Sequence, residues 1–162
     1  MTPTTAHQVI IPAALQLVPP QMRSPRAEAM LIAIALQESD FRHRRQIHGP
    51  ARSFWMFEAI GVAGVLMHNA TRQHALGVCM AMGYAPDAAE IHDAIQHNDV
   101  LACAFARLLL WQVPQALPGR DDTEEAYRQY ISVWRPGRET PARWNARYQT
   151  AWNLVSGERR DH

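Results

Sequence analysis

The chain has 162 residues, 48% of them hydrophobic, and its formal net charge at pH 7 is +1. This length and hydrophobic content predict a single domain, residues 1–162, with a core of its own, and they exclude general disorder. The near-neutral charge excludes a strong electrostatic drive toward nucleic acid. All 16 basic residues are arginine, which does not select a function by itself.

The first 23 residues predict a helix followed by a linker. Residues 5–18 place apolar side chains on one side of a helix, a bend is expected at Pro12, and Pro19-Pro20 ends the helix. The segment has no basic leader, and no apolar run of the chain is long enough to cross a bilayer. We therefore expect synthesis in the cytoplasm without a signal peptide, and no membrane insertion.

Residues 25–39 give the strongest helix prediction of the chain. Ser24 is suited to cap this helix and Pro25 to occupy its first turn. Glu38 falls at the end of the helix, on the same face as its apolar residues. That apolar face consists of Ala27, Leu31, Ile34 and Ala35.

The remainder of the chain predicts a loop followed by six helices. Residues 41–53, which contain Gly49-Pro50, predict the loop, and residues 54–57 are too short for periodicity to separate a strand from a first helical turn. Residues 24–155 would form the core of a mostly α domain, with residues 156–162 as a polar tail. The helix at 99–112 is strongly apolar and is expected to be central and buried. The six helices are expected at 60–68, 73–82, 87–97, 99–112, 123–133 and 141–155.

The cysteines and histidines favour neither a disulfide nor a metal centre. Cys79 and Cys103 lie far apart without a CxxC pattern, so buried free thiols are expected. No two of the eight histidines have the spacing that places both imidazoles on one helical face, so a zinc site would need tertiary assembly. The chain also lacks phosphate-loop, dinucleotide-binding and hydrolase-elbow motifs, and no cofactor or metal is expected.

The run Arg42-His43-Arg44-Arg45 is the only concentrated basic segment. It is short and no basic stripe accompanies it, so a solvated loop is favoured over a nucleic-acid patch. We therefore expect no nucleic-acid partner.

Glu38 has two interpretations. Partial burial, together with the negative end of the helix dipole, would raise its pKa and keep it protonated near neutral pH, as a general acid requires. An ion pair with a nearby arginine would instead lower the pKa. Local chemistry leaves both open.

Four segments of the chain resemble the soluble lytic transglycosylases, relatives of goose-type lysozyme. The first, residues 35–41 (ALQESDF), looks like the Glu-Ser motif that ends a helix in that family. Residues 49–58 stand where a Gly-rich segment follows, and residues 97–109, led by His97-Asn98, resemble an Asn-led core helix. Tyr130 and residues 134–137 lie where a late Tyr-containing motif falls. More narrowly, the arrangement resembles small lysozyme-like proteins of phages and prophages.

The resemblance implies a lysozyme-like fold in which a central apolar helix and a short loop or β segment border an active-site cleft. It implies that Glu38 is the sole acid/base for cleaving the bond between N-acetylmuramic acid and N-acetylglucosamine in peptidoglycan glycan strands. Ser39 would orient Glu38 or contact the substrate. Asn98 and Tyr130 would line the cleft. Met56 and Phe57 would contact the substrate, and Phe57, Trp55 and Trp134 offer flat faces for sugar rings, although core packing suits each of them as well.

Three positions depart from the family pattern and leave alternatives open. Ser53 and Cys103 stand where the family commonly has glycine, and Met56 stands where a glutamine would contact an acetamido group. Glu58 is the candidate second carboxylate for a hydrolytic lysozyme route, whereas Asp40 is expected to bind an arginine. The third alternative is a non-catalytic virion or glycan-binding protein.

The absent leader favours a phage or prophage lysin that reaches the cell wall after release, or a virion-associated murein hydrolase with virion components as partners.

Overall fold

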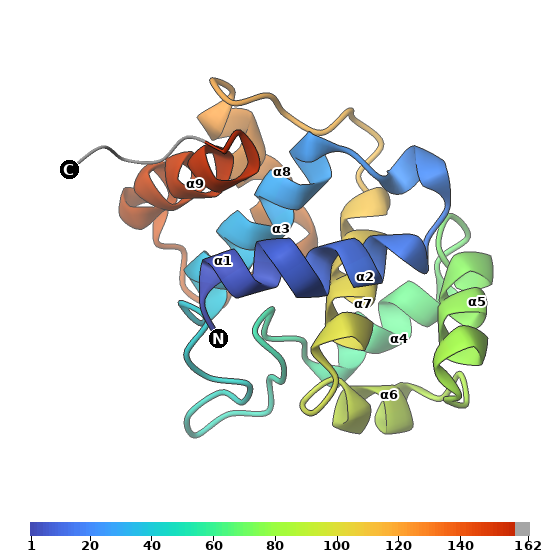
Figure 1. Ribbon diagram of the computed structural model, residues 1–162. Helices are drawn as coiled ribbons and strands as arrows, with labels where there is room; N and C mark the ends of the chain where they lie inside the picture. Colours follow the sequence, from blue (N-terminus) through green and yellow to red (C-terminus); the bar gives the residue numbers. More distant parts are fainter. Residues whose placement is uncertain (158–162) are drawn as a thin grey trace.

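The computed structural model of the protein describes residues 1–157 and is built almost entirely of helices (Figure 1). Within those residues, β-type pairing is limited to two isolated bridges, Arg45 with Arg52 and Arg52 with Phe57. The expected mostly α class is confirmed, and the chain forms one domain. The elements are α1 (Pro3–Thr5), the π-helical turn η1 (Ala6–Ile10), α2 (Ile11–Gln16), the 3₁₀ turn η2 (Pro20–Met22), α3 (Pro25–Glu38), α4 (Ala59–Met67), α5 (Arg72–Met82), α6 (Ala88–Ala94), α7 (Asp99–Trp111), α8 (Thr123–Trp134) and α9 (Pro141–Val155).

Helices α3 and α7 form the centre of the molecule. Every residue of α7 from Leu101 to Leu110 is buried, as its apolar sequence predicts. Helix α3 is also buried without interruption from Ala29 to Leu36, so it is surrounded on all sides rather than covered on one face. Helix α9 packs along α3, and the N-terminal helix packs on α7 (Figure 1).

The predicted N-terminal helix is continuous from α1 to α2. A π-helical turn, η1, lies just before Pro12, where a bend was expected, and in it the N–H of Ile11 reaches back to the carbonyl oxygen of Ala6. Proline has no N–H for an α-helical bond, and a wider turn just before it is a common way to absorb that loss.

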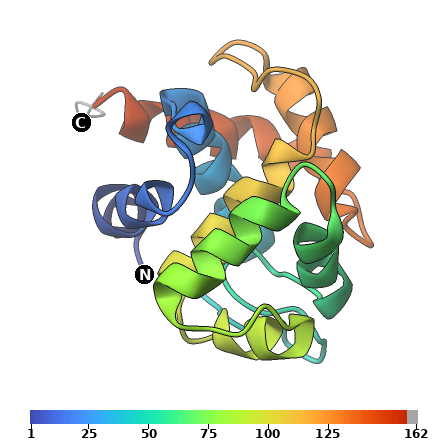
Figure 2. The same cartoon turned by 90° about the vertical axis from the view of Figure 1, so that its right-hand side faces the viewer.

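Helices α4 and α5 pack against α7, and α4 contacts both α5 and α6 (Figure 2). Gly83, with φ of 78°, ends α5 in the left-handed conformation that glycine adopts readily. Helix α6 is shorter than expected; the Asp87 side chain accepts the N–H of Glu90 at its start. No helix among residues 1–157 combines the length and apolar character needed to cross a membrane. Residues 158–162 of the predicted tail lie outside the described residues.

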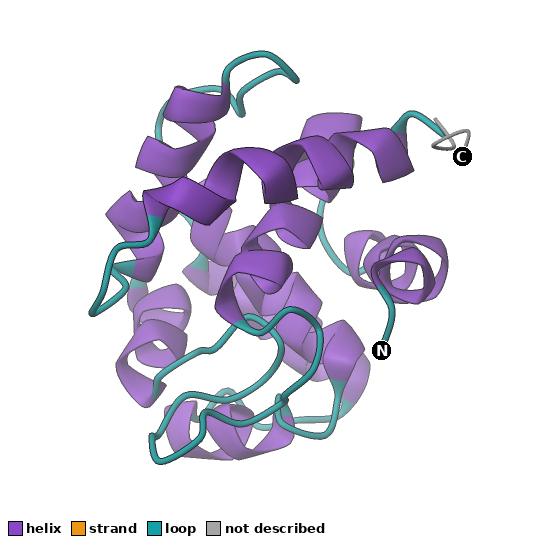
Figure 3. Ribbon diagram, turned by 90° about the vertical axis from the view of Figure 1, so that its left-hand side faces the viewer, coloured by secondary structure: helices purple, strands orange, loops and turns teal. Residues whose placement is uncertain are grey.

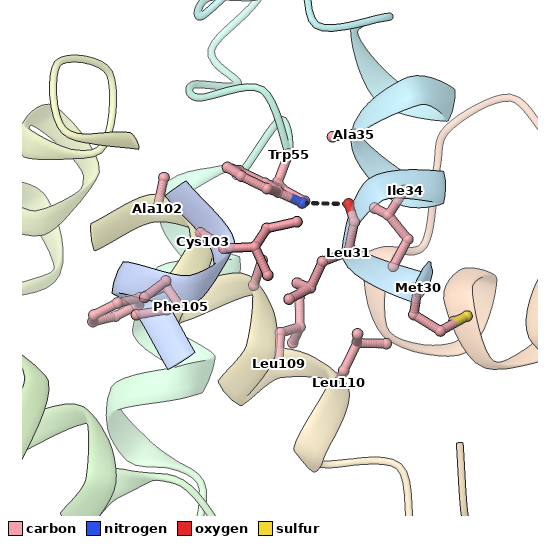
Figure 4. Packing of buried hydrophobic residues seen from close by; sticks show 14 of the residues in the cluster. Met30, Leu31, Ile34, Ala35, Trp55, Ala102, Cys103, Phe105, Leu109 and Leu110 are labelled. Carbon is pink, nitrogen blue, oxygen red and sulfur yellow. Dashed lines mark hydrogen bonds between the residues drawn. The ribbon is translucent and has the colours of Figure 1, made fainter. Parts of the chain in front are cut away.

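A long loop joins α3 to α4 and forms the lower edge of the molecule in Figure 3. Residues 54–57 within it form neither a strand nor a helical turn. They are apolar because they enter the core: Trp55 is fully buried, and its indole N–H donates to the carbonyl oxygen of Leu31 at 2.9 Å (Figure 4). Cys79 and Cys103 are buried free thiols, as expected.

Candidate active site

A groove of about 980 Å³ runs along one side of the domain. The end of α3, the α3–α4 loop and the first turns of α4 form part of its wall. The end of α8, the α8–α9 connection and the start of α9 complete it. Gly61 and Gly64 lie on the wall formed by α4, and nothing lies within 4 Å of the point where a Gly64 side chain would begin.

Glu38 lies on this groove as the last residue of α3. Its Oε1 accepts a hydrogen bond from the hydroxyl of Tyr130. Burial raises the pKa of Glu38 from 4.5 to about 7, although the Tyr130 hydrogen bond and the positive charge of Arg147 both act to lower it. The guanidinium of Arg147 instead donates to the backbone and side-chain oxygens of Gln37, at 3.1 and 2.8 Å. Desolvation therefore outweighs the nearby arginine, and the carboxyl is poised to exchange a proton near neutral pH.

A stack of aromatic rings fixes the hydroxyl that Glu38 contacts. The rings of Tyr130 and Trp144 are parallel to within 4°, with centroids 5.1 Å apart, and Trp144 stacks in turn on Tyr148 at 5.8 Å. Trp144 also donates its indole N–H to the carbonyl oxygen of Thr123. Trp144, Tyr148 and Trp152 share one face of α9, so helical periodicity builds the support for Tyr130. Tyr130 is only 2% exposed and acts on the site through Glu38.

Ser39 lines the groove beside Glu38 but its hydroxyl faces elsewhere. The hydroxyl oxygen lies 3.1 Å from the carbonyl oxygen of Ala35 and 2.8 Å from that of Phe54, and it donates to these acceptors rather than to Glu38. The expected role of orienting the carboxyl directly is therefore corrected: Ser39 ties the end of α3 to the α3–α4 loop.

The α3–α4 loop contains several residues with positive φ, among them the buried Ser53 at 69° and the groove-lining Met56 at 49°. This conformation favours glycine, which explains physically why glycine would suit position 53. The Ser53 hydroxyl accepts the N–H of Trp55 at 3.2 Å, a local contact that helps to hold the turn. Met56 is half-buried on the groove wall and offers a thioether there in place of an amide.

The three aromatic residues that were expected to offer faces for sugar rings differ in exposure. Trp55 lies in the hydrophobic core. Phe57 is 2% exposed, and the centroid of the Phe57 ring lies 5.9 Å from that of Trp134. Trp134 is half-buried and lines the groove, and its indole N–H donates to the carbonyl oxygen of Trp55 at 2.8 Å. The structure therefore leaves Trp134 as the aromatic with a usable face.

Glu38 and Glu58 are the acidic residues on the groove wall. Glu58 is exposed and precedes α4 without capping it through its side chain. Asp40 forms a salt bridge with Arg42 at 3.4 Å, as expected for a carboxylate that binds an arginine.

The structure does not bring Asn98 to the groove, which corrects the expected cleft role. Its side-chain oxygen accepts the N–H of Leu101 at 3.0 Å and so caps α7, and its amide donates to the Tyr84 hydroxyl. The neighbouring Asp99 binds Arg44 through two hydrogen bonds of 2.9 and 2.8 Å. The His97-Asn98-Asp99 segment thus starts a helix and anchors the loop.

The sequence interpretation missed a set of arginines on the groove wall. Arg143 and Arg147 are four residues apart on α9, and that spacing alone predicts a shared face. The others come from turns whose direction depends on tertiary packing. The full set is Arg45, Arg135, Arg138, Arg143 and Arg147.

The site therefore combines a proton donor of near-neutral pKa, a buried hydroxyl that supports its ionised form, and a groove open to an extended ligand. These elements suit acid/base chemistry on a polymer. Comparison of the chain with protein-family models, with curated proteins and with solved structures gives no match.

Proposed function

We propose that the protein cleaves peptidoglycan glycan strands as a lytic transglycosylase, with Glu38 as its single acid/base. The observation that carries this proposal is the half-buried Glu38 carboxyl, whose pKa is raised to about 7, on the wall of an open groove. The Glu-Ser motif and its similarity to the lytic transglycosylases support the same reaction.

Protonated Glu38 donates its proton to the glycosidic oxygen between N-acetylmuramic acid and N-acetylglucosamine, and the bond from that oxygen to the anomeric carbon breaks. The resulting carboxylate accepts a proton from the C6 hydroxyl of the muramic acid as that oxygen bonds to the anomeric carbon. The products are a 1,6-anhydro end and a free N-acetylglucosamine end, and Glu38 is protonated again. Tyr130 stabilises the carboxylate between the two steps by donating its hydroxyl hydrogen.

The biological setting that we propose is a phage or prophage lysin, or a virion-associated murein hydrolase. The resemblance to small phage-encoded lysozyme-like proteins supports it. In either role the protein would act on the cell wall after release from the cytoplasm or as part of a virion.

Two observations favour specific alternatives. Glu58 lies on the same groove and would supply the second carboxylate of a hydrolytic lysozyme. Met56 replaces an expected amide contact, which favours a module that keeps the groove and binds glycan without cleaving it.

Release of soluble fragments from purified peptidoglycan tests the proposal with Glu38→Gln and Glu58→Gln. Glu38→Gln keeps the side-chain shape and is expected to lower the rate by at least ~10²-fold, because acid/base catalysis is lost. Glu58→Gln is the matched control on the same groove and is expected to retain activity. An equal loss in both variants would instead assign a two-carboxylate hydrolase. Binding without release by the unmodified protein would assign the non-catalytic module.

A further inference from the structure

Positive charge is concentrated in the groove. The whole chain has a net charge of only +1, yet five arginines and two carboxyl groups line this wall. One of the carboxyl groups, Glu38, is partly protonated at neutral pH because burial raises its pKa to about 7. The groove is therefore much more cationic than the protein as a whole.

Among the residues that the structure describes, the five groove arginines lack carboxylate partners, whereas four arginines elsewhere have one. Outside the groove, Arg44 pairs with Asp99 and Arg52 with Asp93. Within residues 1–157, none of the five groove arginines forms a salt bridge. Arg147 donates to Gln37, whereas the exposed Arg138 and Arg143 are available to a ligand.

Two groove arginines also repel each other. Burial is the main cause that lowers the pKa of Arg147; the charge of Arg143, one turn along α9, lowers it further, whereas the charges of Asp40 and Glu38 raise it. Like charges at this spacing are unfavourable, and an anion bound beside the exposed Arg143 would reduce the repulsion. An arginine fork is suited to carboxylate groups, which it binds through two parallel hydrogen bonds.

We propose that the groove selects glycan strands whose stem peptides carry free carboxylates, an inference that rests on the proposed function. The sugar backbone of peptidoglycan is uncharged, and its anionic groups lie on the peptides attached to the muramic acid residues. Arg147 is half-buried near Glu38, whereas Arg138 and Arg143 are exposed at the rim. A sugar bond placed at Glu38 would therefore direct its peptide carboxylates toward Arg138 and Arg143.

A nucleic acid would also carry negative charge, but the groove is less suited to it. A phosphate backbone would bring negative charge toward the half-buried carboxyl of Glu38, and a single partly exposed aromatic residue on the groove wall, Trp134, offers a stacking face. On the neighbouring loop, Arg44 is already paired with Asp99 and so does not extend the groove charge.

Co-sedimentation of the full chain with insoluble peptidoglycan tests this proposal, using Glu38→Gln so that the wall is not digested. One peptidoglycan sample (native wall) keeps its carboxylates. In the other (neutralised wall) they are converted to neutral amides by carbodiimide coupling to an amine that carries no other charge. We expect at least ~5-fold weaker binding to the neutralised wall, and a decline in binding to the native wall with added salt. Equal binding to the two samples would overturn the proposal.

Paired double variants separate groove charge from total charge. Adding Arg138→Gln and Arg143→Gln is expected to weaken binding to the native wall by about 5–10-fold, as two exposed ion pairs are lost. The matched control adds Arg26→Gln and Arg72→Gln, which remove the same charge from exposed positions outside the groove that also lack salt bridges within residues 1–157, and is expected to bind unchanged. Equal losses in the two double variants would overturn the proposal, as would tighter binding of a DNA oligonucleotide than of native wall.

Fragment release by the unmodified protein distinguishes this inference from the function on which it rests. Equal release from native and neutralised walls, together with equal binding, would overturn the carboxylate preference and leave glycan cleavage intact. Failure to release fragments from either wall would overturn the cleavage reaction, while carboxylate-dependent binding would still support the preference of the groove.

Discussion

Glu38→Gln should stabilise the protein in a manner that depends on pH. The folded protein raises the pKa of this carboxyl from 4.5 to about 7, chiefly through burial. Between these two pH values the folded state holds a proton that the unfolded chain has already lost. The contribution of this carboxyl to the free energy of unfolding is therefore fully present below about pH 4.5. It is lost as the pH rises through about 7.

The size of the effect follows from the pKa difference. Each pH unit of separation corresponds to about 1.4 kcal/mol, so a rise from 4.5 to about 7 corresponds to about 3 kcal/mol. Glutamine resembles the uncharged acid and still accepts the Tyr130 hydrogen bond. The variant should match the unmodified protein near pH 4.5 and exceed its free energy of unfolding by about 3 kcal/mol at pH 8, or roughly 6–12 °C in melting temperature.

Urea unfolding of both proteins at intervals from pH 4.5 to pH 8 measures this difference. Glu58→Gln removes an exposed carboxyl from the same groove and serves as the control, with a curve that should follow that of the unmodified protein. If the stabilities of Glu38→Gln and the unmodified protein differ by a constant amount at every pH, burial does not perturb Glu38 and the reasoning is refuted.

Three further variants probe the groups around Glu38. Tyr130→Phe removes a hydrogen bond that lowers the pKa of Glu38, so the fall in fragment release with rising pH should move to higher pH, as a pH–rate profile will record. Arg147→Gln should also move this fall in activity to higher pH, since the charge of Arg147 lowers the pKa of Glu38. A shift toward lower pH in either variant would contradict the effect assigned to that residue. Ser39→Ala should lower the free energy of unfolding by about 1 kcal/mol in urea, because the hydroxyl bond to Phe54 is lost, without moving the pH profile. A moved profile would show that Ser39 acts on Glu38 after all.

Local signals were sufficient to predict most of the helices. Ser24 accepts the N–H of Ala27 where its position predicted a cap, and Gly83 ends α5 where the helix was expected to stop. Strong periodicity also identified α7 as a central element. These features are encoded within one or two turns of chain, so the sequence reveals them directly.

Features that depend on distant parts of the chain were harder to predict. Residues 54–57 are too short for periodicity to classify, and their place in the core depends on a hydrogen bond from Trp55 to the backbone of α3, 24 residues earlier. Asn98 matched a family motif, but its side chain is used by its own helix start. Tyr130 was expected in the cleft, yet its contact with Glu38 spans 92 residues and depends on how α8 packs against α9. The groove arginines also come together only through the packing of segments that are distant in the sequence.

The central claim is that Glu38 directs cleavage of the glycan strand through an internal attack by the C6 hydroxyl. Mass analysis of the ends produced from purified peptidoglycan tests it most directly, with Glu38→Gln as the control. The account predicts 1,6-anhydro-muramic ends from the unmodified protein and none from the variant. Reducing muramic ends would contradict the transglycosylase mechanism, and intact glycan strands after prolonged incubation would contradict cleavage altogether.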